Sequence, residues 1–164
     1  MAIWQYSLRV LPSHKHQPNH QLISNEDIAE AWASSPVFVA PIAERIDLLL
    51  PRPDWSTPDF LQWKGDDEQN EDHDCWISVA LQDQTIQGFS FRTDFRDLTK
   101  ARYFLSAMLK ICEERMWLVV DAEGYVWQPE LASLLPSIEQ SSTIRFLTAP
   151  YEFLQQALKE QNRE

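Results

Sequence analysis

Two patterns of apolar residues follow each other within residues 75–115, which read CWISVALQDQTIQGFSFRTDFRDLTKARYFLSAMLKICEER. Residues 75–81 and 85–91 are rich in β-branched and aromatic side chains, and the polar residues 82–84 separate them. Residues 97–115 then place apolar side chains three and four positions apart along one stripe, which is typical of an amphipathic helix. This stretch therefore predicts an antiparallel β-hairpin followed by a long helix.

The rest of the chain repeats these two patterns. Apolar and polar residues alternate over residues 4–10, which indicates a strand with one buried face. Ser24 and Asp27 have the spacing of a helix capping box. Further expected elements are a helix from Pro41, a hairpin of residues 116–120 and 125–127, a helix from Pro129, and a short edge strand at 143–147. Hairpins interleaved with helices predict one α+β domain over residues 1–164, with an antiparallel β-sheet and helices packed mainly on one face.

The charge of the chain is strongly acidic. Its 164 residues carry 14 Lys and Arg against 25 Asp and Glu, a formal net charge of −11. Such a chain repels phosphate backbones and anionic lipids, so we expect no nucleic acid and no membrane as a partner. A basic protein is the expected partner, because opposite fields accelerate encounter.

Glycine and cysteine usage excludes several enzyme classes. The chain has 3 glycines, Gly65, Gly88 and Gly124, and no two of them are close enough to form a phosphate-binding loop. The 2 cysteines, Cys75 and Cys112, form no C-x-x-C pair and are expected to be reduced thiols. The first residues lack the basic start and apolar run of a signal peptide, so we expect a cytoplasmic protein. Because the chain has no phosphate-binding loop, we expect no cofactor.

Residues 54–74 concentrate the negative charge. This segment holds eight carboxylates against one lysine, Lys64, a net charge of −7. With Pro58 and Gly65 inside it and no apolar periodicity, it is expected to be a long acidic loop. The ordinary interpretation is a solvated loop, and the functional one is a surface for a basic partner. The candidate partner-binding residues are Asp54, Trp55, Trp63, Asp66, Asp67, Glu68, Glu71 and Asp72.

Two other groups contain residue types that can bind metals or act in catalysis. His14, His16 and His20 are of a type that binds divalent metals, although the neighbouring prolines and Lys15 favour a solvated polar loop. Charged residues at 92–97 lie between a strand and the main helix, where catalytic groups often occur. The structural interpretation of this second group is that Asp94 or Asp97 caps the helix and the arginines pair with these carboxylates. We therefore expect no metal site and no catalytic residue.

The second half of the chain resembles a known kind of protein. Its layout is carried by residues 76–91, 97–115, 117–121 (WLVVD), 124–129 (GYVWQP), Ser141, Phe146, Pro150 and Phe153. Over residues 75–158 this is similar to small acidic immunity proteins of bacterial polymorphic-toxin systems. The resemblance implies a toxin inhibitor that is not an enzyme. It assigns no individual residues, because such families share no catalytic residues and vary in their toxin contacts.

These observations predict a non-enzymatic acidic protein-binding module, an immunity protein or inhibitor that covers the active site of a basic toxin. It would act as a monomer or homodimer, with residues 159–164 frayed at the C-terminus. Two alternatives stay open. One is a small metal-assisted hydrolase that uses the histidine group or residues 92–97, and the other is a structural adaptor or homo-oligomer subunit.

Overall fold

The structure is a computed structural model that describes residues 2–12, 16, 18, 21–65, 72–150, 152, 155 and 159. Strands and helices alternate along these residues. The elements are β1 (Gln5–Leu11), α1 (Asn25–Ser34), α2 (Ala40–Asp47), β2 (Phe60–Lys64), β3 (Asp74–Ala80), β4 (Thr85–Asp94), α3 (Leu98–Glu114), β5 (Leu118–Val120), β6 (Val126–Trp127), α4 (Leu131–Gln140) and α5 (Ser142–Thr148).

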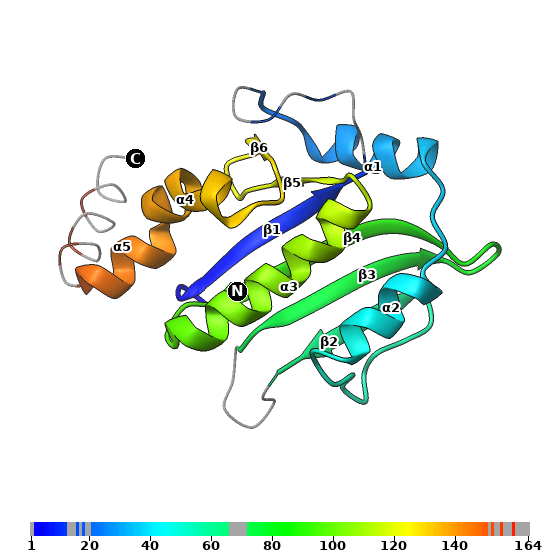
Figure 1. Cartoon of the computed structure of the whole chain (residues 1–164), viewed down its shortest axis with the longest axis horizontal. Helices are drawn as coiled ribbons and strands as arrows, with labels where there is room; N and C mark the ends of the chain where they lie inside the picture. The colour runs from blue at the N-terminus through cyan, green and yellow to red at the C-terminus, as the bar shows by residue number, and fades with distance from the viewer. Residues whose placement is uncertain are drawn as a thin grey trace.

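The strands form one antiparallel sheet in the order β2-β3-β4-β1-β5-β6 (Figure 1). β3 and β4 form the hairpin that the sequence predicts, and β5 and β6 form the second one. β1, the first strand of the chain, lies between β4 and β5 and so joins the two hairpins into one sheet. The predicted antiparallel α+β fold is confirmed.

One face of the sheet is apolar and is covered by α2 and α3 (Figure 1). Trp63, Cys75 and Phe91 are paired in register across β2, β3 and β4, so their side chains share this face. The ring of Phe91 meets Phe104 of α3 edge-on, with centroids 6.4 Å apart. The indole N–H of Trp63 donates a hydrogen bond to Asp47 of α2 at 2.7 Å. The core therefore lies between this face and the two helices.

The opposite face is polar in the half formed by β2, β3 and β4. Lys64, Asp74 and Arg92 are aligned across the three strands, and Trp76 and Ser90 form part of the next row. Most of these side chains are partly exposed. A sheet with one packed and one solvated face is common among antiparallel folds.

Helix α1 lies across the end of the sheet at which β1 ends (Figure 1). Its predicted capping box is present: the Ser24 hydroxyl accepts from Asp27 N–H at 3.1 Å, and the Asp27 carboxylate accepts from Ser24 N–H at 3.0 Å. Trp32 is buried, and its indole N–H donates to the Val10 carbonyl oxygen at 3.1 Å. This contact anchors the helix to the end of the first strand.

Two predictions of local structure are wrong. The expected loop at 54–74 contains β2, which pairs with β3 along its whole length, and Asp74 already belongs to β3. Residues 143–147 are part of helix α5 and do not form an edge strand. The helix is favoured because the Ser141 hydroxyl accepts from Ile144 N–H at 3.3 Å, while the Thr143 hydroxyl donates to the Gln5 carbonyl oxygen at 2.9 Å.

Candidate functional site at the β2–β3 end of the sheet

The acidic stretch between β2 and β3 leaves the sheet and returns to it at one point. Lys64 and Asp74 are paired in register, and Gly65 N–H donates to the His73 carbonyl oxygen at 2.9 Å. The approach is close, because a Cβ atom on Gly65 would lie 2.5 Å from an oxygen of Asp72. The candidate residues Asp66, Asp67, Glu68 and Glu71 lie outside the described residues.

Asp74, at the start of β3, is engaged in a buried ion pair. It is 7% exposed, and Arg92 on the neighbouring strand donates to both of its oxygens, with Nε 2.7 Å from Oδ1. The guanidinium of Arg92 also lies 4.9 Å from the centre of the Trp76 ring. The side-chain amide of Gln5 donates to the Asp72 carbonyl oxygen at 2.6 Å, which ties this point to β1. Asp74 therefore holds the strand ends together.

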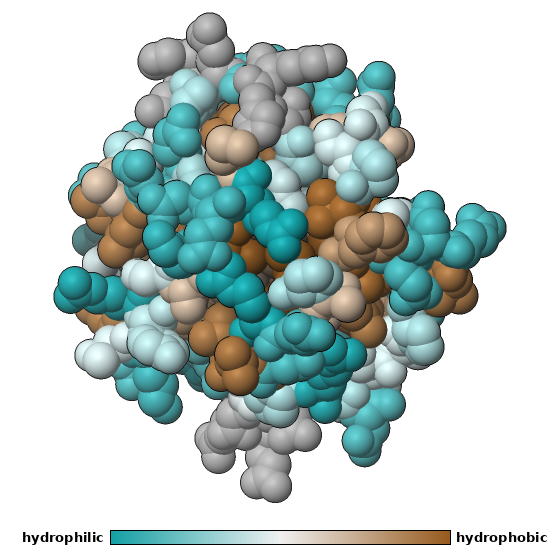
Figure 2. All heavy atoms as spheres, turned by 45° about the vertical axis from the view of Figure 1, so that its right-hand side comes forward, coloured by the Kyte–Doolittle hydropathy of each residue, from teal (hydrophilic) through white to brown (hydrophobic). Residues whose placement is uncertain are grey.

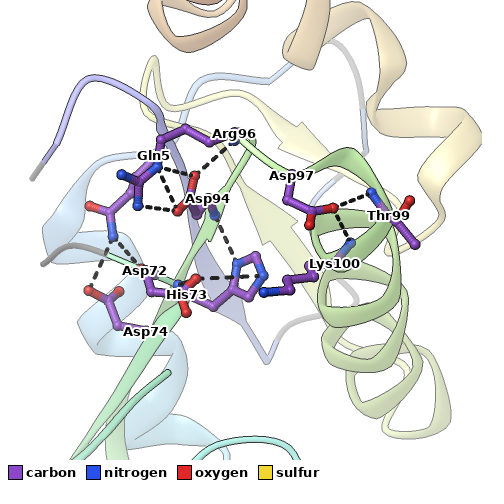
Figure 3. A network of polar contacts seen from close by, with 9 residues as sticks. All are labelled: Gln5, Asp72, His73, Asp74, Asp94, Arg96, Asp97, Thr99 and Lys100. Atoms are coloured by element: carbon purple, nitrogen blue, oxygen red, sulfur yellow. Dashed lines mark hydrogen bonds and ion pairs between the residues drawn. The ribbon is translucent and has the colours of Figure 1, made fainter. Parts of the chain in front are cut away.

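The charged residues between β4 and α3 also have structural partners (Figure 3). Asp94 is 6% exposed and accepts from the backbone N–H and the guanidinium of Arg96, with Nη2 2.6 Å from Oδ2. Asp97 caps α3 by accepting from the N–H groups of Thr99 at 3.0 Å and Lys100 at 3.1 Å. Of the two predicted caps, Asp97 is the one observed.

His73 lies at the centre of this network (Figure 3). It is 7% exposed, and its ring stacks on Phe104 with centroids 4.7 Å apart. Nδ1 accepts from Asp94 N–H at 2.9 Å, so in the neutral ring the proton is on Nε2. Burial lowers the pKa of His73 below its ordinary 6.5, against the opposing effect of the neighbouring carboxylate of Asp72. Nε2 has no hydrogen-bond partner in the described part of the chain, since the nearest Asp72 oxygen is 3.9 Å away.

His73 was not predicted as a site residue, because it is surrounded by acidic neighbours in the sequence. A signal was present: His73 continues the alternation of Cys75 and Ile77, which are both fully buried on the helix-covered face. Extending the strand pattern backwards by two residues would have predicted a buried histidine.

A groove opens beside His73, between the residues that follow α2 and the first turns of α3. It has a volume of about 390 Å³ and mainly apolar walls, formed by Leu49, Leu50, Tyr103 and Phe104. The side chain of Lys100 extends toward the His73 ring from α3 (Figure 3). The groove thus combines an apolar surface with two nitrogen donors.

Trp55 is more exposed than Phe60 and Trp63, the other two large aromatic residues of the acidic segment. Its side chain is 53% exposed, and Phe60, at the start of β2, is 37% exposed. Asp54 and Asp59 on the same segment are exposed and make no ion pair with any described residue. The polar sheet face continues this surface, because Trp55 and Trp76 line a shared pocket of about 150 Å³.

Trp63 is not an interface residue, and this corrects the prediction. It is 1% exposed and belongs to the core beneath α2. Its indole N–H is bonded to Asp47, and the guanidinium of Arg52 lies 5.0 Å from its ring. The alternation of β2 places Trp63 on the packed face, while Lys64 is on the polar face.

Both outer edges of the sheet are covered by neighbouring segments. On β2, the outward N–H groups of Phe60, Gln62 and Lys64 donate to the segment of residues 51–57, at 3.0 to 3.1 Å. On the other side, Val126 N–H donates to the Gln21 carbonyl oxygen at 3.3 Å. Covered edges resist the addition of a strand from another chain, so a partner would contact side chains.

The predicted histidine group falls largely outside the described residues. His14 and His20 lie outside the described residues, and within the described ranges no three His, Cys, Asp or Glu side chains gather as a metal site requires. No helix among the described residues is long and apolar enough to cross a bilayer. Comparisons with protein-family models, with curated proteins and with solved structures find no match for this chain.

Proposed function

We propose that this chain is a non-enzymatic acidic protein-binding module that neutralises a basic protein, in the manner of an immunity protein that covers a toxin's active site. One observation carries the proposal. Trp55 is 53% exposed, and it lies in the sequence between Asp54 and Asp59, which are both exposed, in a chain of net charge −11. An accessible tryptophan on a strongly acidic chain has the chemistry of an interface anchor for a partner of opposite charge.

The polar network at the sheet end supports binding over hydrolysis. Asp74 and Asp94 are each paired with an arginine, and Asp97 caps a helix. Carboxylates held in this way maintain the fold, and they are poorly placed to act as acids or bases on a substrate. The carboxylates that remain for a partner are those of the exposed surface.

The proposed contact is made by side chains, because the sheet edges are covered. Exposed carboxylates would imitate the phosphates that a basic nuclease binds, and they would speed its approach. Trp55 would then be buried against the partner. Asp66, Asp67, Glu68, Glu71 and Asp72 would extend the same field, since the stretch that contains them leaves the sheet beside the paired strands β2 and β3.

Affinity capture from a lysate of the source organism tests this function. The tagged chain is compared with a triple variant, Asp54→Asn, Trp55→Ala and Asp59→Asn, and with a matched control, Leu135→Ala, which alters an exposed residue of α4. We expect one basic protein to bind the unaltered chain and the control, to elute at raised salt, and to be lost with the triple variant. Equal capture by the triple variant, or no basic protein at all, would contradict the proposal.

Once the partner is isolated, the rate of association tests whether the negative charges steer the two proteins together. Reversing the charge of Asp66, Asp67, Glu68 and Asp72 should slow association at low salt by about tenfold or more and flatten its salt dependence. An unchanged association rate would remove steering from the mechanism and leave Trp55 as the anchor.

A further inference from the structure

The groove beside His73 is open to solvent, and exposed apolar residues lie near it in the sequence. Tyr103 is 72% exposed, and Leu48 and Leu98, close in sequence to the groove residues, are 86% and 67% exposed. Figure 2 shows that the face it draws is mainly hydrophilic, with apolar side chains gathered in separate patches. An accessible apolar groove on a strongly charged protein is a candidate binding site.

The wall of this groove contains a buried donor, the Nε2–H group of His73. Nδ1 of His73 is occupied by Asp94 N–H, so Nε2 carries the proton of the neutral ring. Nε2 has no hydrogen-bond partner in the described residues, although His73 is more than nine-tenths buried. Stacking on Phe104 keeps the ring from turning, and the ring edge with Nε2 faces Lys100 on α3 (Figure 3). Buried polar groups almost always have a partner, so this N–H is available to an acceptor that a ligand brings.

The surrounding charges select the kind of acceptor. The Asp72 carboxylate lies 3.9 Å from His73 Nε2 and offsets the positive charge of Lys100. Asp74 and Asp94 are each paired with an arginine. The site therefore has no excess of positive charge to attract a carboxylate or phosphate, and a neutral oxygen is the suitable acceptor. The walls formed by Leu49, Leu50 and Tyr103 require that this oxygen be next to an apolar group. A peptide carbonyl beside an apolar side chain has both properties.

We infer that the groove between α2 and α3 binds an apolar side chain of the partner protein, while His73 Nε2–H donates a hydrogen bond to the adjacent peptide carbonyl oxygen. This inference rests on the proposed protein-binding function and adds a second contact to it. Lys100 moves aside or donates to the same oxygen as the peptide enters. The partner thus presents an exposed apolar residue in addition to its basic surface.

Capped amino acids test the groove directly. The isotope-labelled full chain is titrated with N-acetyl-leucinamide, with N-acetyl-leucine, which has a free carboxylate, and with N-acetyl-glycinamide, which has no side chain. We expect saturable NMR shifts for the backbone amides of Leu49, Leu50, Thr99 and Tyr103 and for Nε2 of His73, strongest with the leucinamide. Shifts that do not saturate, or stronger binding of the free carboxylate, would overturn the inference.

Variants separate the hydrogen bond from the apolar contact. His73→Asn keeps an oxygen that can accept from Asp94 N–H but removes the Nε2 donor, and it should weaken leucinamide binding by about three- to tenfold. Tyr103→Ala alters an exposed wall, preserves the fold and should weaken binding by a similar factor. Lys110→Ala, at an exposed position further along α3, is the matched control. Unchanged binding in both groove variants would refute the assignment.

The outcome of the titration with capped amino acids is independent of the lysate experiment. If no basic partner is captured, the proposed function fails, and the titration still decides whether the groove binds peptide. If a basic partner is captured equally well by Tyr103→Glu and by the unaltered chain, the groove is not part of the interface, and the function stands without it.

Discussion

Nδ1 of His73 accepts a hydrogen bond of 2.9 Å from the backbone N–H of Asp94, 21 residues further along the chain. The bond joins the residue that precedes β3 to the last residue of β4, and it exists only while Nδ1 is unprotonated. The protonation state of one buried ring is therefore coupled to the integrity of the sheet end that carries the acidic segment.

This coupling predicts that the free energy of unfolding falls on acidification. Burial lowers the pKa of His73 in the folded chain below the ordinary 6.5. Below about pH 6.5 the unfolded chain binds a proton that the folded chain does not, so stability is complete above this pH and declines until the folded pKa is reached. Urea unfolding between about pH 7.5 and 5.0 should show this decline, and His73→Asn should reduce it. An identical pH dependence in the variant would contradict the prediction.

The ion pair of Asp74 and Arg92 predicts a large stability effect. Asp74 is 7% exposed, so Arg92→Met leaves a buried carboxylate without its bidentate partner and should cost about 2–4 kcal/mol in urea unfolding. The double variant Asp74→Asn, Arg92→Met should cost less than the sum of the single changes, because neither charge is then stranded. Additive losses would show that the two residues contribute independently.

Substitutions of the two tryptophans of the acidic segment should differ sharply in their effect on the free energy of unfolding. Trp63 is 1% exposed and bonded to Asp47, so Trp63→Leu should lower the free energy of unfolding by about 3 kcal/mol. Trp55→Ala should change it by no more than about 0.5 kcal/mol, because the side chain is half exposed. Chemical denaturation of both variants provides the comparison, and comparable losses would place Trp55 in the core.

The cysteines should be inert in the folded chain. Cys75 and Cys112 are buried free thiols; burial raises the pKa of Cys112 to about 12 and that of Cys75 well above its ordinary value. Because the thiolate is the reactive form, Ellman's reagent should label neither residue under native conditions and both after unfolding in guanidinium. Rapid labelling of the native chain would show that the core opens near these strands.

Local patterns predicted those elements whose stability is decided within a few residues. Residue spacing alone predicts three of them: the capping box of Ser24 and Asp27, the hairpin of β3 and β4, and the apolar stripe of α3. β2 was missed because the five residues from Phe60 to Lys64 lie among charged neighbours and become a strand only by pairing with β3. Helix α5 was missed because its β-branched residues favour a strand locally, and its cap and the bond from Thr143 to Gln5 outweigh that preference.

The candidate site shows the same division. The amino-acid sequence by itself determined the acidity of the chain, its concentration in residues 54–74, and the scarcity of glycine that excludes phosphate-binding loops. Only the tertiary structure decided that Trp63 is buried while Trp55 is exposed, and that Asp74 is paired. It also decided that a histidine whose Nε2 has no acceptor among the described residues lies beside an apolar groove. The reason is physical: charge and composition belong to the chain, whereas burial and hydrogen bonding depend on strand register and helix packing, which join residues such as Gln5 and Asp72 that are 67 positions apart.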